Sequence, residues 1–124
     1  MTIVCVDDHP IMLKGLSQSI AEISPDATIG LFGRGDEALE FAKVHGCDIL
    51  ISEIELCGID GLTLAKSIKE LNPNVNIIFL TVCDEKEYAK EVFKLKPSGY
   101  LVKPVKTEQL KFELDNLRYG LCEM

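Results

Sequence analysis

Five short apolar runs alternate along the chain with stretches whose apolar residues recur every three or four positions. The runs are rich in β-branched side chains and predict strands over Ile3 to Val6, Thr28 to Phe32, Ile49 to Ile51, Val75 to Leu80 and Tyr100 to Val102. The stretches between them predict amphipathic helices around Met12 to Ile23, Ala38 to Ala42, Leu64 to Leu71, Tyr88 to Leu95 and Leu110 to Leu121. The chain therefore reads as a strand followed by a helix, five times over.

This alternation favours a mainly parallel sheet with helices on both faces, an α/β fold in three layers. Pro10 suits the first position of a helix, and Pro25 and Pro73 follow helices, which agrees with the predicted boundaries. The length of 124 residues fits a single domain, 1–124. The last residues, 119–124, are expected to fray or to begin a connection to a further domain.

Composition and charge narrow the class of protein. No apolar run approaches the ~18 residues of a membrane span, and the first residues lack the basic and apolar regions of a secretion signal. The formal charge of −7 would repel a nucleic-acid backbone. The five cysteines, at positions 5, 47, 57, 83 and 122, show no C-x-x-C spacing. We therefore expect a cytoplasmic protein with reduced thiols, with no membrane contact and no direct nucleic-acid binding; Cys5 is expected to be a small buried apolar residue.

Polar side chains follow the predicted strands at the edge where ligands bind in open parallel sheets. The strands are followed by Asp7 and Asp8, by Glu53, by Thr81 and by Lys103. Three carboxylates, a hydroxyl and an ammonium suit a hard cation beside an oxyanion, and Mg²⁺ is the natural choice. The simpler alternative is that the two aspartates only cap the first helix. His9, in the same run, is expected to be a first-turn residue with a solvated ring.

Four segments together resemble one known family. They are Val6 to Pro10, Asp48 to Gly61, Leu80-Thr81 and Gly99 to Pro104. In this order, and each at a predicted strand end, they resemble the receiver domain of bacterial two-component response regulators. The resemblance covers a core of about residues 2–118.

The resemblance implies a flavodoxin-like, doubly wound five-stranded parallel sheet of order 2-1-3-4-5. It also implies a signalling module, not an enzyme, that takes a phosphoryl group from a sensor histidine kinase or phosphotransfer protein onto an aspartate, with Mg²⁺ as cofactor. The face formed by the fourth helix, fifth strand and fifth helix would pair two receivers or dock an effector. A covalent output domain would follow Met124.

The resemblance implies roles for the residues of this chain that stand at the family's functional positions. Asp7 and Asp8 match the metal-binding acidic pair, Thr81 the hydroxyl that contacts the phosphoryl group, and Lys103 the lysine that pairs with it. Tyr100 matches the aromatic switch position, so Thr81 and Tyr100 together form the expected switch.

Further matches concern the backbone of the site. The backbone carbonyl of Glu55 would be a metal ligand, and Lys103-Pro104 would carry a cis peptide. Gly58 and Gly61 match the turn after the third strand, where glycine tolerates unusual dihedral angles.

The phosphoacceptor position holds Glu53, where the family has aspartate; Glu53 would also be a metal ligand. Cys57 replaces a proline, Cys83 stands where access to the site is tuned, and Leu95-Lys96-Pro97 replaces a run of small residues. Because one added methylene moves the carboxylate by about 1 Å, a displacement that can cost about 100-fold in rate, phosphotransfer to Glu53 is disfavoured. The alternative is a phosphate-independent pseudo-receiver that acts as an interaction or dimerisation module.

Two other classes share parts of the pattern. A flavin-binding module has the same predicted topology, but its phosphate loop needs hydroxyls and glycines where this chain has Asp7, Asp8, His9 and Pro10. A small metal-dependent hydrolase would use Asp7 as nucleophile, His9 as general acid or base and Asp8 on the metal.

Overall fold

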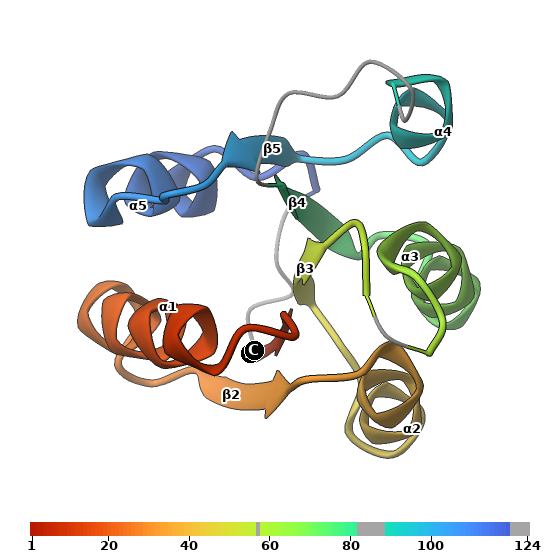
Figure 1. Ribbon diagram of the computed structural model, residues 1–124, viewed down its shortest axis with the longest axis horizontal. Coiled ribbons are helices and arrows are strands. Elements are labelled where there is room, and N and C mark those ends of the chain that lie inside the picture. The colour runs from red at the N-terminus through yellow and green to blue at the C-terminus, as the bar shows by residue number, and fades with distance from the viewer. Residues whose placement is uncertain (57, 82–88, 120–124) are drawn as a thin grey trace.

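The computed structural model describes residues 1–56, 58–81 and 89–119 (Figure 1). Five parallel strands form one sheet in the order β2-β1-β3-β4-β5, which confirms the predicted topology. The strands are β1 Thr2–Val6, β2 Thr28–Phe32, β3 Ile49–Glu53, β4 Asn76–Thr81 and β5 Gly99–Val102. Strand β3 runs two residues beyond its predicted end because its pairing with β4 continues to the register Glu53 with Leu80. Glu53 and Thr81 are thus the last residues of their strands.

Helices cover both faces of this sheet, as expected. They are α1 Pro10–Ile23, α2 Gly35–His45, α3 Gly61–Leu71, α4 Ala89–Lys94 and α5 Thr107–Asp115. Helices α1 and α5 lie on one face and α2, α3 and α4 on the other (Figure 1). Among the described residues, no helix is long and apolar enough to cross a membrane.

The last helix is shorter than its apolar spacing predicts. Helix α5 ends at Asp115, where the Asn116 side chain donates to the Phe112 carbonyl at 2.8 Å and satisfies a group that the helix leaves open. Leu117 therefore lies beyond the helix, and Leu121 lies outside the described residues, as does Tyr88 at the predicted start of the fourth helix.

Tyr119 is not frayed, so the first of the two alternatives expected for residues 119–124 is wrong at this residue. Its backbone N–H donates to Asn76 Oδ1 at 2.7 Å, and Asn76 Nδ2 donates to its carbonyl at 2.9 Å. The Asn76 side chain is buried at the start of β4, so these two bonds attach the chain to the sheet well beyond the end of α5. Residues 120–124 lie outside the described part of the chain.

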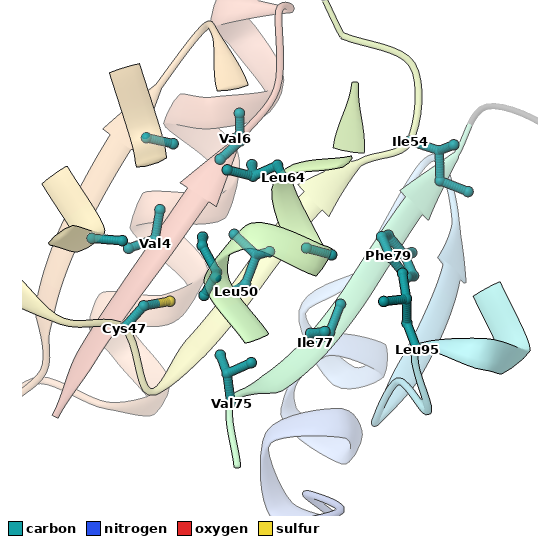
Figure 2. Packing of buried hydrophobic residues seen from close by; sticks show 14 of the residues in the cluster. Val4, Val6, Cys47, Leu50, Ile54, Leu64, Val75, Ile77, Phe79 and Leu95 are labelled. Atoms are coloured by element: carbon teal, nitrogen blue, oxygen red, sulfur yellow. The ribbon is translucent and has the colours of Figure 1, made fainter. Parts of the chain in front are cut away.

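Two apolar cores lie on the two faces of the sheet. One lies between the sheet and α2, α3 and α4, and Figure 2 shows Leu50, Leu64 and Phe79 packed within it. The other lies under α1 and α5 and includes Ile20 and Leu110. All residues of β3 and β4 are buried, which explains why these two strands read as continuous apolar runs in the sequence.

Two cysteines belong to these cores. Cys5 and Cys47 are unpaired and buried, which confirms the expectation for Cys5. Burial, reinforced by the neighbouring Cys47, raises the pKa of the Cys5 thiol to about 12. Burial and the nearby Asp48 charge raise the pKa of Cys47 to about 12. Both thiols are therefore protonated and inert at neutral pH. Cys57, Cys83 and Cys122 lie outside the described residues.

Candidate functional site

The site is assembled at the carboxyl edge of the sheet by continuation of the strand ladders. Asp7, the first residue past β1, donates its backbone N–H to the Phe32 carbonyl at 3.1 Å. Lys103, the first residue past β5, donates its backbone N–H to the Thr81 carbonyl at 2.7 Å. Because all strands run in the same direction, these residues and Glu53 meet at one edge.

Lys103 joins the two buried carboxylates of the site. Its Nζ lies 2.5 Å from Asp7 Oδ2 and 2.5 Å from Glu53 Oε2. The lysine side chain is 7% exposed, and the two carboxylates are 0% and 6% exposed. Burial lowers the pKa of Lys103, but the close pairing with Asp7 and Glu53 outweighs this and raises the pKa above its usual value. The Lys103 ammonium thus forms ion pairs with two buried carboxylates.

Glu53 is held at both of its carboxylate oxygens. Oε1 accepts a hydrogen bond from the Ile54 backbone N–H at 3.2 Å, and Oε2 pairs with Lys103. The backbone around it is confined by α3, because a Cβ added to Gly61 would overlap the Glu53 carbonyl oxygen. The requirement for glycine at position 61 therefore comes from a close approach of helix and strand.

A second group of polar atoms lies at the start of α1. The backbone N–H of His9 donates to Asp7 Oδ1 at 2.9 Å, and His9 Nδ1 lies 2.8 Å from the same oxygen. Asp8 Oδ1 is 3.2 Å from His9 Nδ1. The ring is 60% exposed, as expected, but its contact with Asp7 was not expected. The immediate sequence Asp7-Asp8-His9 is the signal that could have indicated it.

These side chains are suited to a divalent cation. One ligand atom from each of Asp7, Asp8 and His9 can be chosen so that all lie within 4.8 Å of one another. The aspartate oxygens fit the Mg²⁺ that the sequence implies. Glu53 is turned toward Lys103 instead, and Glu55 lies in the loop after β3; their roles as metal ligands stay predictions.

The predicted switch residues lie on neighbouring strands. Thr81 is buried at the end of β4, opposite Val102 in β5. Tyr100 lies opposite Phe79 and packs, partly buried, against the core under α2, α3 and α4. The switch role of this pair stays a prediction.

Two backbone predictions are confirmed. The Lys103–Pro104 bond is cis, and Gly58 has a φ of 79°, in the left-handed region that favours glycine. In the unusual run before β5, Lys96 also adopts a positive φ, of 50°.

A sheet of this order with an acidic pocket and a lysine at its carboxyl edge defines the class of receiver domains. The sequence matches the family described as the response regulator receiver domain over residues 3–115, and the chain belongs to that family. Membership favours the receiver over the flavin-binding module and the hydrolase.

Several curated proteins are similar to this chain. The transcriptional regulatory protein YesN of Bacillus subtilis is 34% identical, over 93% of this chain and 32% of its own length. The positive alginate biosynthesis regulatory protein of Pseudomonas aeruginosa is 33% identical, over 89% of this chain and 44% of its own length. The nitrate/nitrite response regulator protein NarL of Escherichia coli is 28% identical, over 88% of this chain and 50% of its own length. The chain thus spans half or less of the length of these relatives.

Solved structures agree with this placement. The isolated REC domain of RcsB from Salmonella enterica serovar Typhimurium superposes with a TM-score of 0.81 at 28% identity, covering 93% of this chain and 86% of that chain. A chemotaxis protein, CheY4 of Vibrio cholerae, superposes with a TM-score of 0.81 at 23% identity, covering 92% and 95%; at that identity it supports the fold alone.

Proposed function

We propose that this chain is the receiver of a cytoplasmic response regulator, with Glu53 in the phosphoacceptor position, relaying a signal from a sensor histidine kinase or phosphotransfer protein. The observation that supports this most is the convergence of Asp7, Glu53, Thr81 and Lys103 at one sheet edge. The relatives are about twice as long or longer, which supports a further domain in the whole protein. In this proposal that domain is an output domain beyond Met124.

Each residue has a role in this proposal. Asp7 and Asp8, with Glu53 and the Glu55 carbonyl, hold Mg²⁺, which when bound neutralises charge on the phosphoryl oxygens. The Thr81 hydroxyl and the Lys103 ammonium contact the same group. Lys103 is already confined at the site by its two ion pairs, so little of its side-chain freedom remains to be lost when it binds an anion.

A second function is favoured by one specific contact. Lys103 already pairs with Glu53, so the site has an anion beside its lysine without any phosphate. Glu53 supplies about one negative charge where an acyl phosphate would bring about two. In this second function the chain is a phosphate-independent pseudo-receiver that acts as an interaction or dimerisation module.

The output surface in either case is the face of α4, β5 and α5. Each element exposes one large apolar side chain: Phe93 is 79% exposed, Val102 41% and Phe112 63%. Exposed apolar side chains of this size suit a protein partner or a second copy of the chain.

Intact-mass spectrometry after treatment with acetyl phosphate and Mg²⁺ separates the two functions. A gain of about 80 Da on the unchanged chain, absent from Glu53→Gln, supports phosphotransfer to Glu53. A gain on Glu53→Asp alone supports the pseudo-receiver, since a shorter carboxylate then restores the in-line position. If a folded Glu53→Asp variant also gains no mass, the phosphorelay proposal is overturned.

A further inference from the structure

The side chains of three consecutive residues place their donor atoms together just before α1. His9 Nδ1 lies 2.8 Å from Asp7 Oδ1 and 3.2 Å from Asp8 Oδ1. We propose that Asp7, Asp8 and His9 form a site for a first-row transition-metal ion such as Ni²⁺, with the imidazole of His9 as its third ligand. This deepens the metal-binding part of the proposed function and does not depend on phosphotransfer.

The distances between the donor atoms match those around one such ion. Bonds from these metals to carboxylate oxygen and imidazole nitrogen are about 2.0 to 2.2 Å long, so two ligands at a right angle lie about 3 Å apart. The distances from His9 Nδ1 to Asp7 Oδ1 and to Asp8 Oδ1, 2.8 Å and 3.2 Å, lie on either side of this value. The two donor pairs that involve His9 therefore already have the spacing of neighbouring metal ligands.

Electrostatics at the site also favour a cation. Asp7 Oδ2 and Glu53 Oε2 are shielded from water, and both form an ion pair with the Lys103 ammonium. One positive charge thus faces two buried carboxylates, and Asp8 adds a third negative charge beside them. An ion between Asp7, Asp8 and His9 would reduce this excess.

The position of Lys103 limits how tightly any cation binds. Its Nζ is 3.5 Å from His9 Nδ1, so the ammonium repels an ion at this site. This repulsion acts on all divalent cations alike. The informative quantity is therefore the difference in affinity between Ni²⁺ and Mg²⁺. The His9 imidazole determines this difference, because imidazole suits nickel, copper and zinc, whereas Mg²⁺ prefers oxygen ligands.

His9 is well placed to act as a ligand without supporting the fold. It occupies the position before α1 but makes no side-chain capping bond to that helix. Its ring is 60% exposed, so the imidazole is open to solvent. The second histidine, His45, offers a matched control: it is exposed at the end of α2, where its ring packs on Phe41 at 4.5 Å between centroids.

Calorimetric titration with Ni²⁺ and with Mg²⁺ tests the proposal on the whole chain. In His9→Ala we expect the Kd for Ni²⁺ to rise at least about tenfold, because mutation of even a group that orients a metal ligand typically costs about 10- to 100-fold in affinity, while the Kd for Mg²⁺ stays within about twofold. His45→Ala should leave both values unchanged. Circular dichroism verifies that each variant is folded.

Three results would overturn the proposal. The first is an unchanged Kd for Ni²⁺ in His9→Ala. The second is a Kd for Mg²⁺ that rises in His9→Ala as much as the Kd for Ni²⁺, which would mean that His9 only positions Asp7. The third is a loss of Ni²⁺ binding in His45→Ala as large as the loss in His9→Ala. Pulsed electron paramagnetic resonance of bound Mn²⁺ gives a second measure, since coupling to an imidazole nitrogen should be present in the unchanged chain and absent from His9→Ala. If Mg²⁺ binds but no result depends on His9, the proposed function survives and this inference fails.

Discussion

At the scale of single residues, Lys103 determines the electrostatics of the site. It is the ammonium that faces both Asp7 and Glu53, and all three side chains are nearly inaccessible to water. A buried ion pair contributes little net stability as a pair, but removing one partner leaves the other charge uncompensated. The lysine is therefore needed for stability as long as both carboxylates are present.

Replacing this lysine should destabilise the protein in a way that depends on Glu53. We expect Lys103→Met to lower the free energy of unfolding by about 3 kcal/mol, because two carboxylates then share a buried space without a cation. Adding Glu53→Gln should recover part of this loss. Urea unfolding of the single and double variants measures the coupling, and additive losses would contradict the pairing.

The two buried thiols predict how stability depends on pH. In the folded state the pKa of Cys5 and of Cys47 is raised from 9.0 to about 12. A group whose folded pKa is raised contributes stability that is complete below the unfolded pKa and is lost as the pH rises toward the folded pKa. The relevant window is therefore from about pH 9 to about pH 12.

We accordingly expect the free energy of unfolding to fall between pH 8 and pH 10.5 by about 2 kcal/mol for each thiol. Urea denaturation at the two pH values measures the fall. A double variant, Cys5→Ala with Cys47→Ala, is the control: it should lose less stability over the same interval. An equal loss would show that other groups cause the dependence.

At the scale of elements, the approach of α3 to the end of β3 sets the position of Glu53. The first residue of α3, Gly61, lies so close to the Glu53 carbonyl that a side chain would overlap it. The backbone N–H of Gly61 donates to the Ile54 carbonyl at 2.8 Å, which adds a hydrogen bond to this close contact.

Gly61→Ala should therefore be strongly destabilising and should displace Glu53. We expect a loss of more than about 2 kcal/mol, because the obstructing atoms belong to the backbone and cannot rotate away. Gly15→Ala in α1 is the matched control: a Cβ there meets nothing within 4 Å, and the helix should gain about 0.5 to 1 kcal/mol. Thermal unfolding compares the two, and similar values for both would contradict the close contact.

At the scale of the whole molecule, the candidate site and Tyr119 lie at opposite ends of the sheet. Strand β4 begins at Asn76, which holds the backbone of Tyr119, and ends at Thr81 in the site. Under the proposed function, an output domain that follows the chain is therefore joined to the receiver at the end of the sheet farther from the site.

Self-association through the face of α4, β5 and α5 is the expected output at this scale. We expect Glu53→Asp treated with acetyl phosphate to associate more strongly than the untreated variant, and Phe112→Glu in that background to weaken the association at least about tenfold by placing a charge in an apolar contact. Val44→Glu is the control, since Val44 is 76% exposed on α2, on the other side of the sheet from α5. Analytical ultracentrifugation measures both, and equal effects would contradict this face.

Much of this architecture could be predicted from local patterns. The two central strands are buried on both faces and read as apolar runs, and the helices carry their apolar residues at helical spacing. Parallel strands bring their carboxyl ends to one edge, so the convergence of Asp7, Glu53, Thr81 and Lys103 followed from their positions at strand ends. These properties depend on apolar runs and on the helical period of about 3.6 residues, and both can be read from a single sequence.

Other features depended on contacts between distant residues, and only the tertiary structure decided them. Lys103 forms ion pairs with both Asp7 and Glu53 because these residues lie at the ends of three strands that meet at one edge of the sheet. Tyr119 is held in place by Asn76, 43 positions earlier, and no periodic pattern signals such a bond. The adjacency of Asp7 and His9 in the sequence puts a contact within reach, but the rotamer that makes it was selected by the charges and space around the His9 ring. The sequence alone therefore determined the order of the elements and the edge at which the site lies, while packing in three dimensions determined which charges meet there.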